Sequence, residues 1–244
     1  MQSKPKDNYY TKTQEMDINT INILIIYFNN EITNGEIPLF RGAIIYSMEN
    51  KPLLFHNHAE DGYRYSYPLI QYKRIRGKAA IVCLKQGTED IGELFSTKLQ
   101  SLTIGTRVIT PTVDKILPRR IRIQIWNNLF SYRINRWIPL NSKNYKEYSL
   151  LTDDTEKAQF LSKILTGTIL SMAKGLGIMF EQEVKCEITT FTESTTVKIK
   201  GIAMQCIDAE FKCNVSIPNY IGLGKHASIN YGVVTKMKIN NNEE

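Results

Sequence analysis

The clearest hydrophobic pattern in the chain is a strict alternation near the C-terminus. Odd-numbered positions from 207 to 217 are apolar, and the even-numbered positions between them are polar. Because side chains of a strand leave its two faces alternately, this period predicts a long half-buried strand. It leads into a segment containing Gly222, Gly224 and Gly232, which we expect to be a loop followed by a further strand.

A helical period precedes that strand. Asp153 and Glu156 resemble a capping box, and Gly175 and Gly177 are expected to end the helix. The apolar residues that share one face of this predicted helix are Ala158, Leu161, Leu165, Ile169 and Met172.

The N-terminal half contains shorter segments of both periods. Strands are predicted at residues 18–28, 53–58, 67–75, 78–84 and 120–125. Helices are predicted at residues 38–48, where Pro38 suits the first turn, and at residues 88–102, where Thr88 is the expected N-cap. In residues 120–125 isoleucines alternate with basic or polar residues, which predicts one buried and one solvated face.

The order of these elements predicts an α+β protein with two tandem ferredoxin-like (RRM-like) domains, each built on an antiparallel sheet. Residues 184–191 and 195–202 are the expected hairpin of the second domain. We place the N-terminal domain at residues 1–148 and the C-terminal domain at residues 149–244.

Composition narrows the class of partner. The 244 residues include 31 Lys and Arg against 24 Asp and Glu, and this net charge of +7 favours a polyanionic ligand. The four cysteines are scattered, so we expect neither a zinc site nor disulfides, no cofactor, and a reducing cytoplasm. The apolar run at residues 23–28 is too short to span a bilayer, so no membrane association is expected.

Two of the three histidines, His56 and His58, lie two residues apart on a predicted strand. Their side chains would leave the same face, and two imidazoles there can act as general base and general acid near neutral pH. The same pair can instead bind a metal, although no carboxylate or thiol cluster lies nearby in the sequence. Both can also be ordinary surface residues.

The glycine-rich segment has its own candidate chemistry. Gly222-Leu223-Gly224 is followed by Lys225 and then by Asn230-Tyr231-Gly232. Such a turn can bring backbone N–H groups close to an anionic ligand. A hairpin loop relieved by glycines explains the same pattern, and the spacing fits neither a dinucleotide-binding motif nor a P-loop.

Together these segments resemble the CRISPR-associated endoribonucleases that cut precursor CRISPR RNA within its repeats. The C-terminal loop of that family usually shows Gly-apolar-Gly twice, and Asn230 stands here where the second copy begins. Asparagine tolerates a positive φ better than other non-glycine residues, so the departure is mild. The run from Leu54 to His58 and the run from Gly62 to Lys73 resemble one branch of the family.

The resemblance implies which residues act. In that branch the paired histidines and a following tyrosine are implicated in cleavage, and the matching positions are His56, His58 and Tyr65. The implied reaction is a metal-independent attack of the ribose 2′-hydroxyl on the adjacent phosphorus. Its products are a 2′,3′-cyclic phosphate and a 5′-hydroxyl, and DNA should not be cut. Packing across the sheet explains Tyr65 equally well.

Several basic and glycine residues are candidates for holding the RNA. Lys73 is a candidate for stabilising charge on the reacting phosphate, although a solvated lysine is the simpler interpretation. Arginines at 119, 120, 122, 133 and 136 are interleaved with Trp126, Phe130, Tyr132 and Trp137, as phosphate contacts with base stacking would require. A sheet with one basic solvated face explains these arginines as well. The predicted RNA-binding residues are Lys73, Arg119, Arg120, Arg122, Gly222, Gly224, Lys225 and Gly232.

The sequence therefore predicts an endoribonuclease whose partner is CRISPR repeat RNA. The main alternative is a non-catalytic subunit that holds guide RNA in a CRISPR effector complex. The third hypothesis is a basic α/β protein with an unrelated role. Other effector subunits and a second copy of the chain are further candidate partners.

Overall fold

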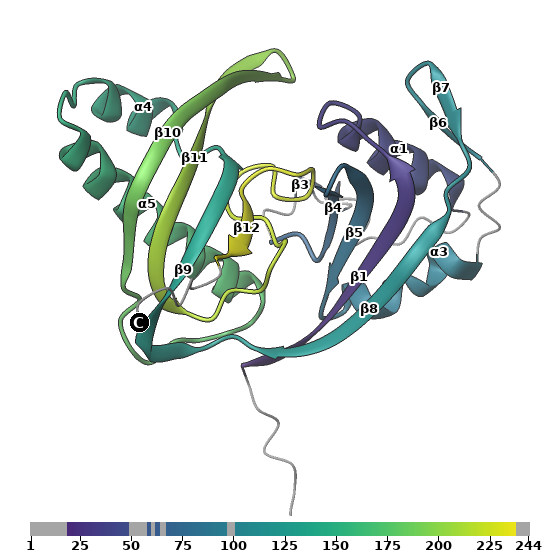
Figure 1. Ribbon diagram of the computed structural model, residues 1–244, viewed down its shortest axis with the longest axis horizontal. Helices are drawn as coiled ribbons and strands as arrows, with labels where there is room; N and C mark the ends of the chain where they lie inside the picture. Colours follow the sequence, from purple (N-terminus) through teal and green to yellow (C-terminus); the bar gives the residue numbers. More distant parts are fainter. Residues whose placement is uncertain (1–18, 49–57, 60–61, 64–66, 97–100, 238–244) are drawn as a thin grey trace, which may run out of the picture.

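The computed structural model describes residues 19–48, 58–59, 62–63, 67–96 and 101–237. Its first sheet, here the N-terminal sheet, is antiparallel throughout (Figure 1). The strands run in the order β4 (Ile70–Ile75), β5 (Lys78–Leu84), β1 (Thr20–Glu31) and β8 (Val113–Arg122). This is the strand order of a ferredoxin-like domain, and the predicted strands at 18–28, 67–75 and 78–84 are confirmed. The terminal segments 1–15 and 240–244 and most of the predicted strand 53–58 lie outside the described residues.

Helix α1 (Ile37–Ser47) and the short helices α2 (Gly87–Asp90) and α3 (Gly92–Ser96) accompany this sheet, along with two small hairpins. The hairpins are β2 (His58–Ala59) with β3 (Gly62–Tyr63), and β6 (Leu102–Ile104) with β7 (Arg107–Ile109). Buried residues of α1 and α3 join Phe28 and Tyr72 in one hydrophobic cluster. This cluster is the core of the N-terminal domain.

The predicted helix at residues 88–102 is wrong in two respects. Thr88 is not an N-cap but lies inside α2, where its hydroxyl donates to the Lys85 carbonyl at 2.7 Å. Leu102 lies in β6 instead of the helix. The apolar spacing was nevertheless informative, because Ile91 and Leu94 are buried as that helical face requires.

The second sheet, here the C-terminal sheet, has the strand order β10 (Cys186–Ile199), β11 (Ile202–Val215), β9 (Ile125–Trp137) and β12 (Val233–Lys236). Helix α4 (Ser142–Ser149) and the long helix α5 (Asp154–Gly175) follow β9. The Asp153 carboxylate caps α5 by accepting from the N–H groups of Thr155 and Glu156, as predicted. Between β11 and β12, where a ferredoxin-like domain has its second helix, this chain has the glycine-rich segment.

The predicted hairpin at residues 184–202 is also wrong. β10 is continuous through both predicted strands, and its partner is the alternating strand β11. The reversal occurs at Lys200 and Gly201, whose φ angles are 48° and 82°. Register irregularities in β10 at residues 188–190 and 193–196 interrupted the alternation and produced the apparent break.

The sheets also place the domain boundary differently. β8 ends at Arg122 in the N-terminal sheet and β9 starts at Ile125 in the C-terminal sheet, so the chain changes sheets at Ile123 and Gln124 (Figure 1). The expected boundary at residue 148 lies at the end of α4 instead. A hydrophobic pattern identifies a strand but does not show which sheet the strand joins.

Strand β8 is more exposed than its alternating pattern suggested. Each of its residues is exposed or half-buried, and Ile116 is 45% exposed. β8 pairs only with β1 and forms the edge of its sheet.

A second hydrophobic cluster joins the two domains. Isoleucines 21, 23 and 25 of β1 belong to the same hydrophobic cluster as Trp137 of β9 and Leu165 of α5. The Lys85 ammonium donates to the Leu176 carbonyl at 2.8 Å, just beyond the end of α5. Strands β1, β4 and β5 of the N-terminal sheet are therefore covered on one face by their own helices and on the other by the C-terminal domain. None of the helices in the described residues is long and apolar enough to cross a membrane.

Candidate functional site

Residues 222–232, here the glycine-rich loop, lie along the edge of β4 that β5 does not pair. Tyr72 and Ile229 form a parallel bridge, and the Tyr72 N–H donates to the Ser228 carbonyl at 2.7 Å. The Arg74 N–H donates to the side-chain oxygen of Asn230 at 3.1 Å. The loop thus extends the N-terminal sheet although it belongs to the C-terminal domain.

Three side chains, from β4 and from Tyr67 before it, form hydrogen bonds with the main chain of the loop. The Tyr67 hydroxyl donates to the Gly222 carbonyl at 2.8 Å, and the Gly222 N–H donates to Gln71 Oε1 at 2.8 Å. The Lys73 ammonium donates to the Ala227 carbonyl at 2.7 Å. Because Gln71 and Lys73 are fully buried, these contacts are shielded from solvent.

The loop owes its shape to left-handed backbone at four positions. The φ angles are +83° at Gly224, +57° at His226, +70° at Asn230 and +59° at Gly232. The expectation that Asn230 tolerates a positive φ is therefore confirmed. Its amide also donates to Asn34 Oδ1 at 3.0 Å, so this side chain ties the loop to the N-terminal domain.

Gly222 and Gly232 are required for close packing. A Cβ at position 222 would lie 2.7 Å from both the Ala227 carbonyl oxygen and Lys73 Nζ, and one at position 232 would overlap the Leu223 carbonyl. Both glycines are buried, and the Gly232 N–H donates within the protein to the Arg136 carbonyl at 3.1 Å. These two predicted RNA contacts therefore have their N–H groups engaged internally.

The exposed part of the loop is its turn at Gly224 and Lys225. Lys225 Nζ donates to the Leu140 carbonyl at 2.8 Å, and partial burial lowers the pKa of this ammonium. Burial, followed by the charges of Lys225 and Lys200, lowers the pKa of His226. His226 is not among the residues predicted from the sequence, although its position between Gly224 and Gly232 is a usable signal.

Most of the predicted catalytic group lies outside the described residues. His56 and Tyr65 are not described, and His58 is described only as the first residue of β2, where it pairs with Tyr63. The chain is described again from Tyr67, whose hydroxyl contacts the glycine-rich loop. In the sequence, His56 and His58 therefore come twelve or more residues before β4, the strand that contacts the loop.

Lys73 occupies a different environment from the one expected for an RNA contact. Its side chain is buried beneath the glycine-rich loop, and burial lowers the pKa of its ammonium to about 7. RNA cannot reach this ammonium while the loop is in place. The structure gives Lys73 a packing position under the loop instead of a place on the surface.

This burial predicts a pH-dependent stability. Below pH 7 both folded and unfolded chains carry the proton, so the cost of the buried charge is fully present. Between pH 7 and about 10.4 only the unfolded chain binds it, so Lys73 should make stability rise by up to about 1.4 kcal/mol per pH unit. Urea denaturation at pH 7, 8 and 9 should show a steeper rise for the natural chain than for Lys73→Met. Parallel pH curves for the two proteins would contradict the buried charge.

The predicted RNA-binding arginines lie together on the exposed edge strand. Arg119, Arg120 and Arg122 are all exposed on β8. Arg119 and Arg120 also line a groove of about 450 Å³, together with Thr88 and residues 22–24 of β1. They offer a continuous basic edge to an anionic ligand.

The aromatic residues interleaved with the arginines divide into two groups. Tyr132 and Trp137 are buried in the core and cannot stack on bases. Trp126 is 42% exposed, and Phe130 is half-buried with the Lys236 ammonium 4.4 Å from its ring centroid. Only the second group is placed where a base could reach it.

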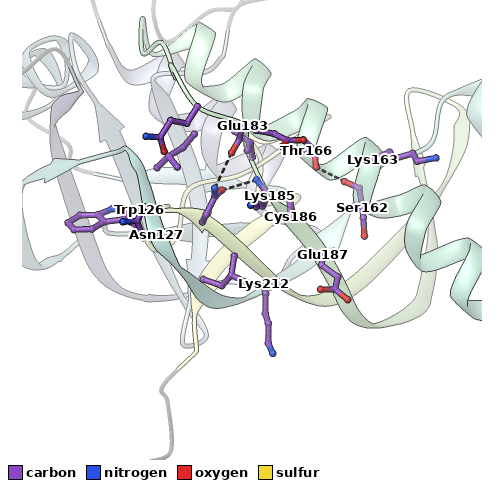
Figure 2. A pocket seen from close by; sticks show the side chains of 15 residues that line it. Trp126, Asn127, Ser162, Lys163, Thr166, Glu183, Lys185, Cys186, Glu187 and Lys212 are labelled. Carbon is purple, nitrogen blue, oxygen red and sulfur yellow. Dashed lines mark hydrogen bonds between the residues drawn. The ribbon is translucent and has the colours of Figure 1, made fainter.

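Trp126 borders a pocket of about 1050 Å³ between β9, α5 and the start of β10 (Figure 2). β9 has four residues between Ile125 and Phe130 where β11 has one, and this bulge opens the pocket. The buried Asn214 side chain fixes the opposite wall by bonding the main chain of Glu183 and Lys185. The charged residues that line the pocket are Lys163, Glu183, Lys185, Glu187 and Lys212.

Comparison with known families identifies the fold and the two domains. The Cas6b N-terminal domain family matches residues 16–121, and the Cas6b C-terminal domain family matches residues 124–237. The chain belongs to the CRISPR-associated Cas6 family. The division between the two Cas6b matches coincides with the change of sheets at residues 123–124.

Solved structures support the same assignment to the Cas6 family. A crystal structure of Cas6b has a TM-score of 0.82 and 26% identity, and the match covers 89% of this chain and all of that one. A second structure, described as the CRISPR RNA processing endoribonuclease Cas6b, has a TM-score of 0.68 and 25% identity, and the match again covers 89% of this chain and all of that one.

A sequence relative matches about half of the chain. It is an uncharacterized protein of Methanocaldococcus jannaschii that is 40% identical over 112 residues, which are 46% of this chain and 75% of that protein.

Proposed function

We propose that this member of the Cas6 family is an endoribonuclease that binds CRISPR repeat RNA and cuts precursor CRISPR RNA within its repeats. The observation that carries the proposal is the docking of the glycine-rich loop on β4, the first long strand after His56 and His58 in the sequence. The likeness to Cas6b over nearly the whole chain supports it.

The proposed chemistry uses protein groups alone. One imidazole of His56 and His58 removes the proton of the 2′-hydroxyl, and the oxygen attacks the adjacent phosphorus. The bond from phosphorus to the 5′-oxygen breaks, and the other imidazole protonates that oxygen. Their ordinary pKa, about 6.5, suits both roles near neutral pH. Tyr65 is assigned to orienting the hydroxyl or donating to the phosphate.

Two surfaces are proposed to hold the RNA. The turn at Gly224 and Lys225 contacts the RNA backbone, because it is the exposed part of the loop. The basic edge of β8 holds another stretch of the RNA through Arg119 and Arg120. Phosphate contacts of this kind position RNA without reading its sequence.

The deciding experiment incubates the full chain with end-labelled repeat RNA in EDTA. A parallel series carries a single 2′-deoxy nucleotide at each candidate position. We expect one cut that ignores the chelator and disappears with one deoxy substitution. Tight binding without a cut would favour a guide-RNA-binding subunit, and a cut that requires added metal would make the histidines ligands.

Replacing Arg119 and Arg120 with alanine should weaken RNA binding in a salt-dependent manner. Each lost contact with a single-stranded phosphate lowers the slope of log K against log salt by about 0.7. We therefore expect the double variant to have a slope smaller by about 1.4, measured by fluorescence anisotropy. Lys143→Ala with Lys146→Ala on α4 removes the same charge elsewhere and should leave the slope unchanged. Equal slopes for both variants would remove β8 from the RNA path.

A further inference from the structure

The contact between Lys73 and the glycine-rich loop is not used by the cleavage chemistry. We propose that Lys73 is a positioning residue: with Tyr67 and Gln71 it fixes the loop in its RNA-binding conformation, and it loosens the loop when its amine gains a proton. The inference rests on the proposed function only in taking RNA as the ligand of the loop.

The geometry places the Lys73 amine where two parts of the loop meet. Nζ donates to the Ala227 carbonyl at 2.7 Å and lies 2.7 Å from the position of a Cβ on Gly222. Gln71 and Tyr67 hold the N–H and the carbonyl of that same glycine. The three side chains thus fix the start and the middle of the loop, while its exposed turn lies between them at Gly224 and Lys225.

The surroundings of Lys73 do not compensate a positive charge. The side chain is fully buried, and among the described residues no carboxylate forms an ion pair with it. Burial alone accounts for the lowered pKa of this group. A buried ammonium without a counter-ion is costly, so protonation favours any state in which the loop lifts and water reaches the amine.

The titratable groups on the packed elements do not offer another explanation. Opposite Lys73 on β5 lies Ala80, and opposite Ala80 on β1 lies Tyr27. Burial raises the pKa of Tyr27 and of Tyr67, so both phenols stay uncharged near neutral pH. The neighbouring basic residues of β4 and the loop have other partners: Arg74 donates to Ile32, Lys225 donates to Leu140, and His226 packs against Tyr231.

Hydrogen exchange of the free protein tests this without any RNA. The amides of Tyr72 and Gly222 donate across the contact between β4 and the loop, so their exchange reports its opening. After correction for intrinsic rates, we expect the opening constant to fall by up to about tenfold per pH unit from pH 7 to 9. Amides between β10 and β11 provide the reference. If the opening constants of the Tyr72 and Gly222 amides change with pH no more than those of the reference amides, the proposal is overturned.

Variants separate positioning from general stability. Lys73→Met should abolish the pH step in exchange and weaken binding of a 2′-deoxy repeat RNA by about fivefold, the value of one lost hydrogen bond. Lys78→Met removes an exposed lysine from β5 and should change neither result. A Lys73→Met protein that keeps the pH step, or binds RNA as tightly as the natural chain, contradicts the proposal.

The outcomes remain distinguishable from those of the proposed function. If the chain binds repeat RNA without cutting it, the cleavage proposal fails while the exchange and binding results still decide the role of Lys73. If Lys73→Met does not fold, the pH series on the natural chain decides it alone. If the chain cleaves repeat RNA but opening of the loop does not depend on pH, the proposed function stands. Lys73 is then rejected as the residue that positions the loop.

Discussion

Replacement of both His56 and His58 with alanine is expected to slow repeat cleavage by about 10⁴-fold while RNA affinity stays within a few-fold. A positioned acid or base contributes about 10²–10⁴-fold, and groups that act as a unit do not add independently. The two single variants should therefore each lose most of this rate. Single-turnover rates at saturating protein isolate the chemical step, and filter binding with 2′-deoxy RNA measures affinity separately.

The pH dependence of the single variants adds a second criterion. The natural chain should show a bell-shaped rate profile, and each variant should lose one limb of it. Thermal melts of each variant control for folding. Cleavage that survives the double replacement would move the chemistry to other residues, and a loss of binding equal to the loss of rate would make the histidines RNA contacts.

The sequence predicted the elements better than it predicted their assembly. The alternation along β11 and the helical face of α5 were visible because each repeats over many residues with one face in the core. Such patterns depend only on local geometry. The same property explains the errors at β10, where local irregularities broke the period within a single strand.

The positions of the functional residues depended on contacts that no local pattern contains. Lys73 and Arg74 are adjacent, and both are basic. The Lys73 ammonium is nevertheless buried under the loop, whereas the Arg74 guanidinium donates to the Ile32 carbonyl. The difference arises because residues from the far end of the chain dock on β4. The resemblance located the loop, but only the fold showed that two of its glycines are packing residues and that its exposed turn is at Gly224.

Substituting alanine for Gly232 should be far more damaging than the same change at Gly201. Both glycines have a positive φ, +59° and +82°, so each substitution introduces left-handed strain of about 1–2 kcal/mol. Gly201 lies in the hairpin turn with nothing within 4 Å of an added Cβ. At Gly232 the Cβ would overlap the Leu223 carbonyl, which is backbone and cannot rotate away.

The glycine-rich loop must therefore shift in Gly232→Ala, which breaks the 2.8 Å hydrogen bond from the Leu223 N–H to the Gly232 carbonyl. We expect a loss of at least about 3 kcal/mol in the free energy of unfolding, against about 1–2 kcal/mol for Gly201→Ala. RNA affinity should fall more than tenfold for the first variant and stay unchanged for the second. Urea denaturation and anisotropy with 2′-deoxy repeat RNA measure the two effects. Equal results for both glycines would mean that backbone strain alone, and not the packed shape of the loop, sets RNA binding.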